Sequence, residues 1–267
     1  MPRTAVSGAR FRWLARVGFA TKGAVYLLMG SLAVLAAAGQ RGGQIGDKRQ
    51  SVQTLHGLPG GRVLLGLIAI GLAGYALLRI VQGLLDTEDK GHDAKGLVRR
   101  FGYVVNGVIY TGLIAFSAHA ALYTRAGRSA REAEQSWAAR ALAWPGGPWL
   151  LVLIGATTVG AGGYTFYQAW TSKFLEAIDL EALGEKRRIF ARRAGQVGYT
   201  ARGVVMVIVG GFFIHAGKTA RAADVGSTED ALDLLRKMGP GVLGVVALGL
   251  AAYGIYALMQ AAHPVRR

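Results

Sequence analysis

Long apolar stretches alternate with short polar segments along the whole chain. Six of them reach the roughly 20 residues that an α-helix needs to cross about 30 Å of hydrocarbon. They lie near residues 17–38, 63–85, 101–123, 149–170, 197–216 and 241–262. All 15 acidic residues fall outside them. The pattern predicts an all-α, polytopic membrane protein with six transmembrane helices.

The odd-numbered stretches open on one shared motif, found at residues 16–26, 100–110 and 196–206. Each copy has a glycine, an aromatic residue, a polar residue and a second glycine at the same offsets. The even-numbered stretches share a second motif, at residues 71–75, 160–164 and 249–253. Repetition at a fixed spacing identifies an architecture more firmly than one motif does.

A Pro/Gly turn precedes each even-numbered stretch, and a short amphipathic segment precedes each turn, most clearly at 230–238. The predicted unit is therefore a span, an amphipathic segment, a turn and a second span. Within a single membrane domain, 1–267, it recurs at about 12–85, 97–170 and 192–262. Because two spans return the chain to its starting side, the three units are parallel, which predicts a pseudo-threefold axis along the membrane normal.

These motifs resemble those of the DUF1206 family. The odd-span pattern Gly-aromatic-x-x-x-Gly-x-x-Tyr and the run Leu-Pro-Gly-Gly-Arg-Val-Leu-Leu-Gly-Leu-Ile-Ala-Ile-Gly-Leu-Ala-Gly-Tyr at 58–75 carry the resemblance. It covers about residues 12–262. It implies a bacterial membrane protein of three two-helix repeats, and it implies no activity.

Composition narrows the functional classes. Charged residues make up 17% of the 267 residues, against about 25% in soluble proteins. The chain has no cysteine, which excludes disulfides, thiolate metal sites and cysteine nucleophiles. The net charge of +16 is carried by loops beside the spans, so anionic membrane lipids are the expected partners. Nucleic acid is not expected, and the sequence identifies no protein partner.

Lysine and arginine favour one side of the predicted membrane. The segments on the side of the termini hold 16 of them and those on the other side hold 12. The positive-inside rule then places both termini in the cytoplasm and the chain in the cytoplasmic membrane, as a multi-pass protein.

Lys22, Asn106 and Arg202 occupy one repeat position, about five residues inside each odd span. Polar side chains at this depth often mark a functional site, and two cations beside an amide suit a phosphate or carboxylate. The simpler interpretation is that Lys22 and Arg202 extend, or snorkel, to the headgroups. Arg79, one turn beyond Tyr75, is a weaker candidate ligand for the same anion.

His119 and His215 form a second repeated pair, near the other ends of their spans. Two facing histidines are able to ligate haem iron axially, although interfacial polar contact is the simpler interpretation. No further cofactor is indicated.

The spans lack carboxylates, and the chain lacks H-E-x-x-H and a P-loop, so nothing argues for an enzyme. The leading hypothesis is a non-enzymatic membrane protein that binds or conducts a small anion or anionic lipid. The alternatives are a structural or assembly protein that packs against partner helices, and a haem-bearing electron carrier.

Overall fold

The computed structural model describes the backbone of residues 5–39 and 130–263, with side chains from 16 and 135 onward, and a few positions between 73 and 97. The regular elements of these residues are α-helices and short 3-10 helices, which confirms the all-α class for this part of the chain. They are α1 (Ala5–Ala37), α5 (Ala130–Leu142), α6 (Gly147–Thr171), η1 (Lys173–Ala177), α7 (Glu185–Thr219), η2 (Ala222–Asp224), α8 (Thr228–Met238) and α9 (Pro240–Ala262).

Four of these helices contain segments long and apolar enough to cross a membrane: Arg16–Ala37, Gly147–Thr171, Glu185–Thr219 and Pro240–Ala262. They match four of the six predicted spans. The remaining two, 63–85 and 101–123, lie outside the described residues except for a few positions. The described residues therefore confirm the membrane-spanning character and leave the number of six as a prediction.

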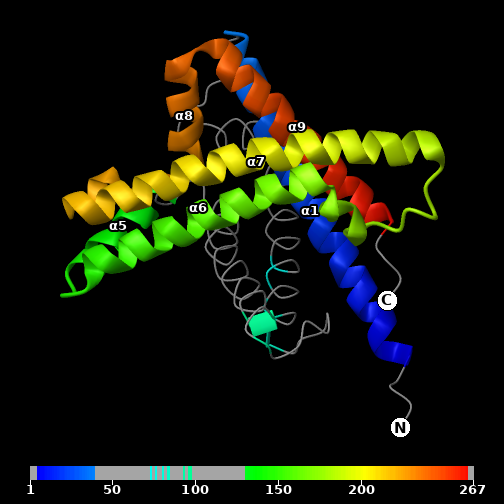
Figure 1. Ribbon diagram of the computed structural model, residues 1–267, viewed down its shortest axis with the longest axis horizontal. Helices are drawn as coiled ribbons and strands as arrows, with labels where there is room; N and C mark the ends of the chain where they lie inside the picture. The colour runs from blue at the N-terminus through cyan, green and yellow to red at the C-terminus, as the bar shows by residue number, and fades with distance from the viewer. Residues whose placement is uncertain are drawn as a thin grey trace, which may run out of the picture.

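The four long helices pack in the order α6, α7, α9, α1, each antiparallel to the next. Figure 1 shows α6 beside α7 and α1 beside α9, with the first pair crossing the second. This arrangement brings the starts of α1 and α7 and the ends of α6 and α9 to one end of the bundle. We call it the terminal end, because the first helix begins there and the last helix ends there.

Glycines bring α1 and α9 into close contact. A Cβ atom on Gly30 would lie 2.5 Å from the backbone nitrogen of Ala251, and one on Gly254 would lie 2.8 Å from the carbonyl oxygen of Gly23. Gly23 also lies against Leu258. Small residues that let two backbones approach are typical of helix pairs in membranes, where dispersion contacts replace the hydrophobic effect as the driving force.

The contact between α6 and α7 repeats these features. A Cβ on Gly210 would lie 2.9 Å from the backbone nitrogen of Val159, and one on Gly162 would lie 3.1 Å from the carbonyl oxygen of Gly203. Gly203 also lies against Phe166. The two helix pairs are therefore two copies of one interface, which we call the seam. The residues of the two seams correspond one to one: Gly23 to Gly203, Gly30 to Gly210, Ala251 to Val159, Gly254 to Gly162 and Leu258 to Phe166.

The seam contacts align the even spans differently from the sequence motif. The motif matches Tyr253 with Tyr164, whereas the seam matches Gly254 with Gly162 and hence Tyr253 with Ala161. The two alignments differ by three residues, nearly one helical turn. The reason is that the glycines in contact determine the register between two packed helices, and these are not the positions at which the two sequences are most similar.

Short helices precede the turns of the second and third repeats, as predicted: α5 and α8. The amphipathic character is confirmed for α8. Helix α8 begins with a capping box, in which the Ser227 hydroxyl accepts from the Glu229 N–H and Asp230 accepts from the Ser227 N–H. It buries Leu232 and Leu235 against α9. Gly239 ends it with φ +141°, a conformation that only glycine adopts readily.

Candidate functional site

The centre of the site is the phenol of Tyr253 on α9, which is 2% exposed. Gly198 of α7 lies directly against the Tyr253 backbone, and a Cβ there would lie 2.6 Å from its nitrogen. On the other side, the ring of Tyr26 from α1 meets the Tyr253 ring edge-on, with centroids 4.7 Å apart. Tyr253 is therefore enclosed where α1, α7 and α9 meet.

Arg202 reaches this phenol from α7. Its Nη1 donates a hydrogen bond of 2.8 Å to the Tyr253 hydroxyl, and its Cζ lies 5.3 Å from the ring centroid. The side chain is half-buried. A guanidinium at this distance from an aromatic ring gains cation–π attraction as well as the hydrogen bond.

Lys22 reaches the same phenol from α1. Its Nζ lies 5.1 Å from the Tyr253 ring centroid, and the residue is only 5% exposed. The structure therefore brings two members of the predicted repeat position, Lys22 and Arg202, onto one residue. Asn106, the third member, lies outside the described residues, as does Arg79.

The two cations lie inside the predicted span and not at its edge. Gln196 marks the level at which α6 ends, because its Nε2 donates to the Ser172 hydroxyl at 3.3 Å. Arg202 follows it by six residues, which is about 9 Å along the helix. Lys22 is buried against Tyr253 at a matching depth. This is the geometry of side chains that point into the protein.

The sequence motifs did not predict which aromatic side chains surround Tyr253. Tyr199 and Tyr256 lie with ring centroids 5.2 Å and 6.4 Å from that of Tyr253, and Phe174 stacks on Tyr199. The even-span motif aligns Tyr253 with Tyr164, but Tyr164 is an exposed residue. The spacing of Tyr253 and Tyr256, three apart on one helix face, was the available signal for an aromatic cluster.

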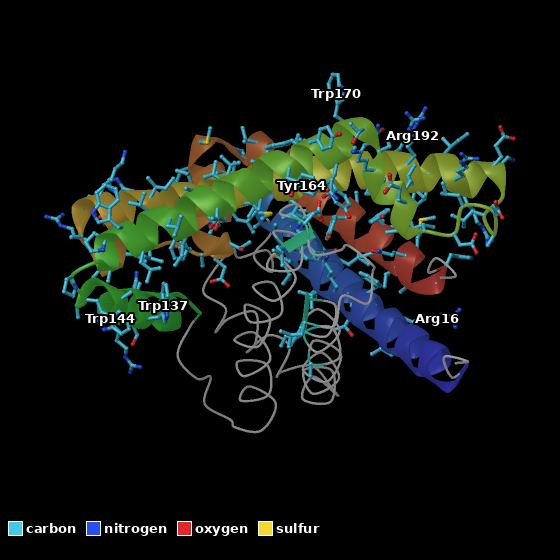
Figure 2. The ribbon with its side chains drawn as sticks, turned by 60° about the horizontal axis from the view of Figure 1, so that its bottom comes forward. Arg16, Trp137, Trp144, Tyr164, Trp170 and Arg192 are labelled. Atoms are coloured by element: carbon cyan, nitrogen blue, oxygen red, sulfur yellow. The ribbon has the colours of Figure 1, made fainter. Side chains whose placement is uncertain are left out.

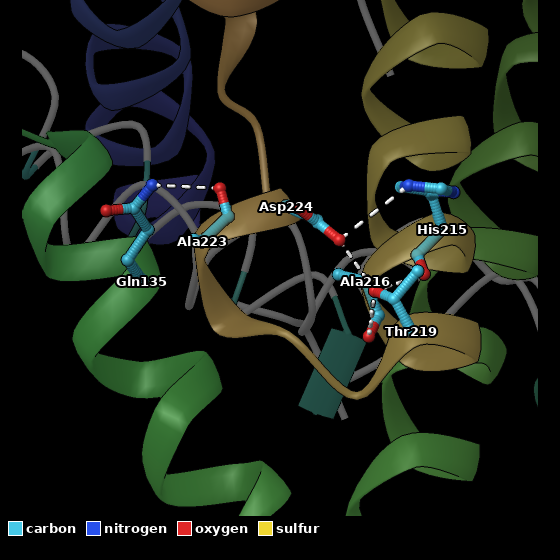
Figure 3. A network of polar contacts seen from close by, with 6 residues as sticks. All are labelled: Gln135, His215, Ala216, Thr219, Ala223 and Asp224. Carbon is cyan, nitrogen blue, oxygen red and sulfur yellow. Dashed lines mark hydrogen bonds and ion pairs between the residues drawn. The ribbon is translucent and has the colours of Figure 1, made fainter.

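His215 lies at the opposite end of α7, far along the helix from Arg202. Its side chain is 66% exposed, and its Nε2 lies 3.7 Å from Asp224 Oδ2, which also accepts a 2.6 Å hydrogen bond from Thr219 (Figure 3). His119 lies outside the described residues, so their pairing stays a prediction. Among the described residues, no group of three or more His, Asp or Glu side chains is placed to hold a metal ion.

A cavity of about 350 Å³ adjoins His215, between the end of α7, η2 and α8. Phe212, Asp224, Asp230 and Lys237 line part of it. Each of these carboxylates has partners within the protein: Asp224 accepts from Thr219, and Asp230 caps α8. The polar groups here hold the connection between α7 and α8 in place.

Exposed aromatic and basic side chains lie toward the two ends of the bundle. Figure 2 shows Arg16 and Arg192 toward the terminal end, and Trp137 and Trp144 at the other. Trp149 and Trp170, both exposed, are 21 residues apart on α6, or about 32 Å. That separation matches the thickness of the hydrocarbon layer, at whose borders tryptophan is enriched.

Apolar helices of bilayer length, packed in antiparallel pairs through a glycine seam that occurs twice, define an all-α protein of membrane-spanning character. The model of one family, the Domain of Unknown Function DUF1206, matches three successive segments of the chain, residues 17–86, 101–172 and 197–263. The chain belongs to the DUF1206 family.

A relative in Bacillus subtilis (strain 168), the uncharacterized protein YxxB, is 32% identical over 247 residues. The alignment covers 92% of this chain and 88% of the relative. No solved structure matches the chain significantly.

Proposed function

We propose that this chain is a non-enzymatic integral membrane protein that holds a small oxyanion between Lys22 and Arg202. The oxyanion is either a free ion, such as phosphate, or the phosphate of an anionic lipid. One observation carries the proposal: two cations from equivalent repeat positions converge on the buried phenol of Tyr253.

Electrostatics support an anion at this place. The Lys22 Nζ and the Arg202 Cζ lie 5.1 Å and 5.3 Å from one ring centroid, so the two positive charges are at most about 10 Å apart, a distance at which like charges repel in surroundings of low dielectric constant. A negative group that contacts both would relieve this repulsion. The planar guanidinium of Arg202 is suited to two parallel hydrogen bonds to an oxyanion, and the ammonium of Lys22 supplies a mobile point charge.

The two seams support a ring of three hairpins. Helix α7, the first span of the third repeat, packs on α6, the second span of the second repeat. Helix α1, the first span of the first repeat, packs in the same way on α9, the second span of the third repeat. A third seam between 63–85 and 101–123 would close a six-helix ring around a pseudo-threefold axis. Lys22, Asn106 and Arg202 would then surround that axis at one depth, with Arg79 as a weaker fourth ligand.

The proposed setting is a bacterial cytoplasmic membrane with the terminal end in the cytoplasm. Five cations and no acidic residue occupy positions 186–193 at that end. Such clusters are retained on the cytoplasmic side and attract anionic lipids.

Native mass spectrometry of the full chain released from a mild detergent tests the proposal. We expect the parent protein to retain an adduct that Lys22→Gln/Arg202→Gln loses. The variant Lys186→Gln/Arg192→Gln removes the same charge from exposed positions and should keep the adduct. A mass equal to that of a phospholipid identifies a lipid, and a mass equal to that of inorganic phosphate identifies a free ion.

Identical adducts in all three proteins, or none, would overturn the anion site. Such spectra would favour the alternative of a structural or assembly protein whose helices pack against partner spans. The haem hypothesis has its own readout, a Soret band in protein purified from haem-supplied cells.

A further inference from the structure

The connection between α6 and α7 folds over the terminal end of the bundle. We call residues 172–184 the cap. Its side chains Phe174, Ile178 and Leu183 are buried together with Tyr256 of α9. The Asp179 N–H donates a 3.0 Å hydrogen bond to the carbonyl oxygen of His263, which attaches the cap to the end of α9. The loop is therefore packed against the helices and does not extend away from them.

Phe174 is the residue of the cap that packs against Tyr199 and Tyr256, the tyrosines next to the cation site. Its ring fills the space left by Gly195, where any Cβ atom would overlap it. It stacks on Tyr199 with centroids 5.0 Å apart and meets Tyr256 edge-on at 5.2 Å. The Tyr256 hydroxyl also donates to the Phe174 carbonyl oxygen at 2.5 Å. Ring and backbone are thus both held in place.

These three rings form a layer between the cap and the cation site. Tyr199 precedes Arg202 by three residues on α7, and Tyr256 follows Tyr253 by three on α9. Since the two helices are antiparallel, both tyrosines lie about one turn nearer the terminal end than Arg202 and Tyr253 do. An ion that moves from that end toward the cations meets this aromatic layer first.

We infer that the cap is a gate for the cation site and that Phe174 is its plug. This inference rests on the proposed function, since it concerns access to the same anion. In the closed state described here, the aromatic layer of Phe174, Tyr199 and Tyr256 lies between the cap and the cations on the side of the terminal end. In the open state, Phe174 leaves the space above Gly195 and an anion passes to Lys22 and Arg202.

The two ends of the cap supply the hinges. Ser172 has φ +56°, a left-handed conformation that costs a non-glycine residue energy. At the other end, Gly184 is exposed and immediately precedes α7. A Cβ atom added to Gly184 would have no described atom within 4 Å, so there is space around this residue. Rotation at these two positions moves the cap without unfolding α6 or α7.

Cysteine labelling tests the gate, because the chain has no cysteine of its own. Tyr26→Cys places a thiol beside Tyr253. In detergent-purified full chain, its labelling rate is measured with neutral methyl methanethiosulfonate and with anionic sulfonatoethyl methanethiosulfonate. We expect Phe174→Ala to raise both rates about tenfold, since labelling follows the open population. Phe174→Leu, which keeps an apolar plug but loses the stacking, should raise them less and serves if Phe174→Ala does not fold.

The control is Leu151→Ala, which truncates a fully buried residue at the opposite end of α6. It should leave both rates unchanged. The gate is overturned if neither Phe174 variant labels faster than its parent, or if Leu151→Ala raises the rates equally, because general loosening would then explain the effect.

The two reagents separate the gate from the anion site. If the site attracts anions, the anionic reagent is favoured over the neutral one, and Lys22→Gln/Arg202→Gln abolishes that preference. A preference that depends on the cations, with rates unchanged by Phe174→Ala, rejects the gate alone. Faster labelling by both reagents without such a preference supports a gate and rejects the anion site.

Discussion

Among single residues, the directions of the Lys22 and Arg202 side chains decide whether an anion site exists. The sequence placed Lys22 and Arg202 at one repeat position, because their motifs align without gaps. It did not predict Tyr253 as their meeting point. Helix rotation is not visible in a uniformly apolar span, and Tyr253 lies 51 residues from Arg202 along the chain. Only packing of three helices brings these groups together.

We expect Tyr253→Phe to weaken anion retention about tenfold while the protein stays folded. The substitution keeps the ring, and with it the cation–π contacts, but removes the hydroxyl that orients the Arg202 guanidinium. A hydrogen bond to a charged group contributes about 1.5–3 kcal/mol. A tenfold loss of affinity corresponds to about 1.4 kcal/mol, which is close to the lower end of that range. The measurement is titration with phosphatidylglycerol followed by native mass spectrometry.

Tyr164→Phe is the matched control for this prediction. Tyr164 is the motif counterpart of Tyr253 but is exposed on α6. Removing its hydroxyl should leave anion retention unchanged. Equal losses in the two variants would mean that the tyrosine hydroxyls act on stability in general and not on Arg202.

Among the elements, the sequence predicted the four described apolar spans because length and apolarity alone decide what crosses a bilayer. It did not predict that α1 and α7 begin twelve residues before these spans. The capped helix α8 was predicted for a similar reason, since its polar and apolar positions alternate with the helical period. The register between spans was not predictable to the same degree. Glycines occur throughout these helices, and only the structure shows that Gly254 and Gly162, not the tyrosine motifs, are equivalent at the seams.

Gly254→Ala should destabilise the protein by about 1–3 kcal/mol, the usual cost of adding a methyl group to a tightly packed place. Its new Cβ would meet the Leu27 backbone nitrogen at 2.6 Å, and backbone atoms cannot move aside as a side chain does. Thermal unfolding in detergent should therefore show a lower Tm than for the parent.

Gly244→Ala makes the same change on the same helix and serves as the control. Its Cβ would meet Ala37 at 3.7 Å, an ordinary van der Waals distance. Because alanine favours the helix, the Tm should stay level or rise slightly. If Gly254→Ala is equally harmless, the seam is looser than its glycine contacts indicate.

In the whole molecule, the antiparallel packing places the starts of α1 and α7 at one end of the bundle. The side of the membrane that this end faces is predicted only from the distribution of lysine and arginine. Single cysteines decide it: Glu181→Cys lies in the cap, and Ala223→Cys lies in η2 at the opposite end. We expect a membrane-impermeant maleimide to label Ala223→Cys in intact cells and Glu181→Cys only after lysis. The reverse pattern would place the termini outside the cytoplasm.

Under the proposed function, Lys22 and Arg202 together hold an anion beside Tyr253. An experimental density map tests it most directly, recorded by electron cryo-microscopy on the full chain in nanodiscs that contain phosphatidylglycerol, with an antibody fragment bound to add mass. We expect density for an anionic group within hydrogen-bonding distance of both the Lys22 ammonium and the Arg202 guanidinium. Side chains that extend away from Tyr253 toward the headgroups, with no density between them, would contradict it.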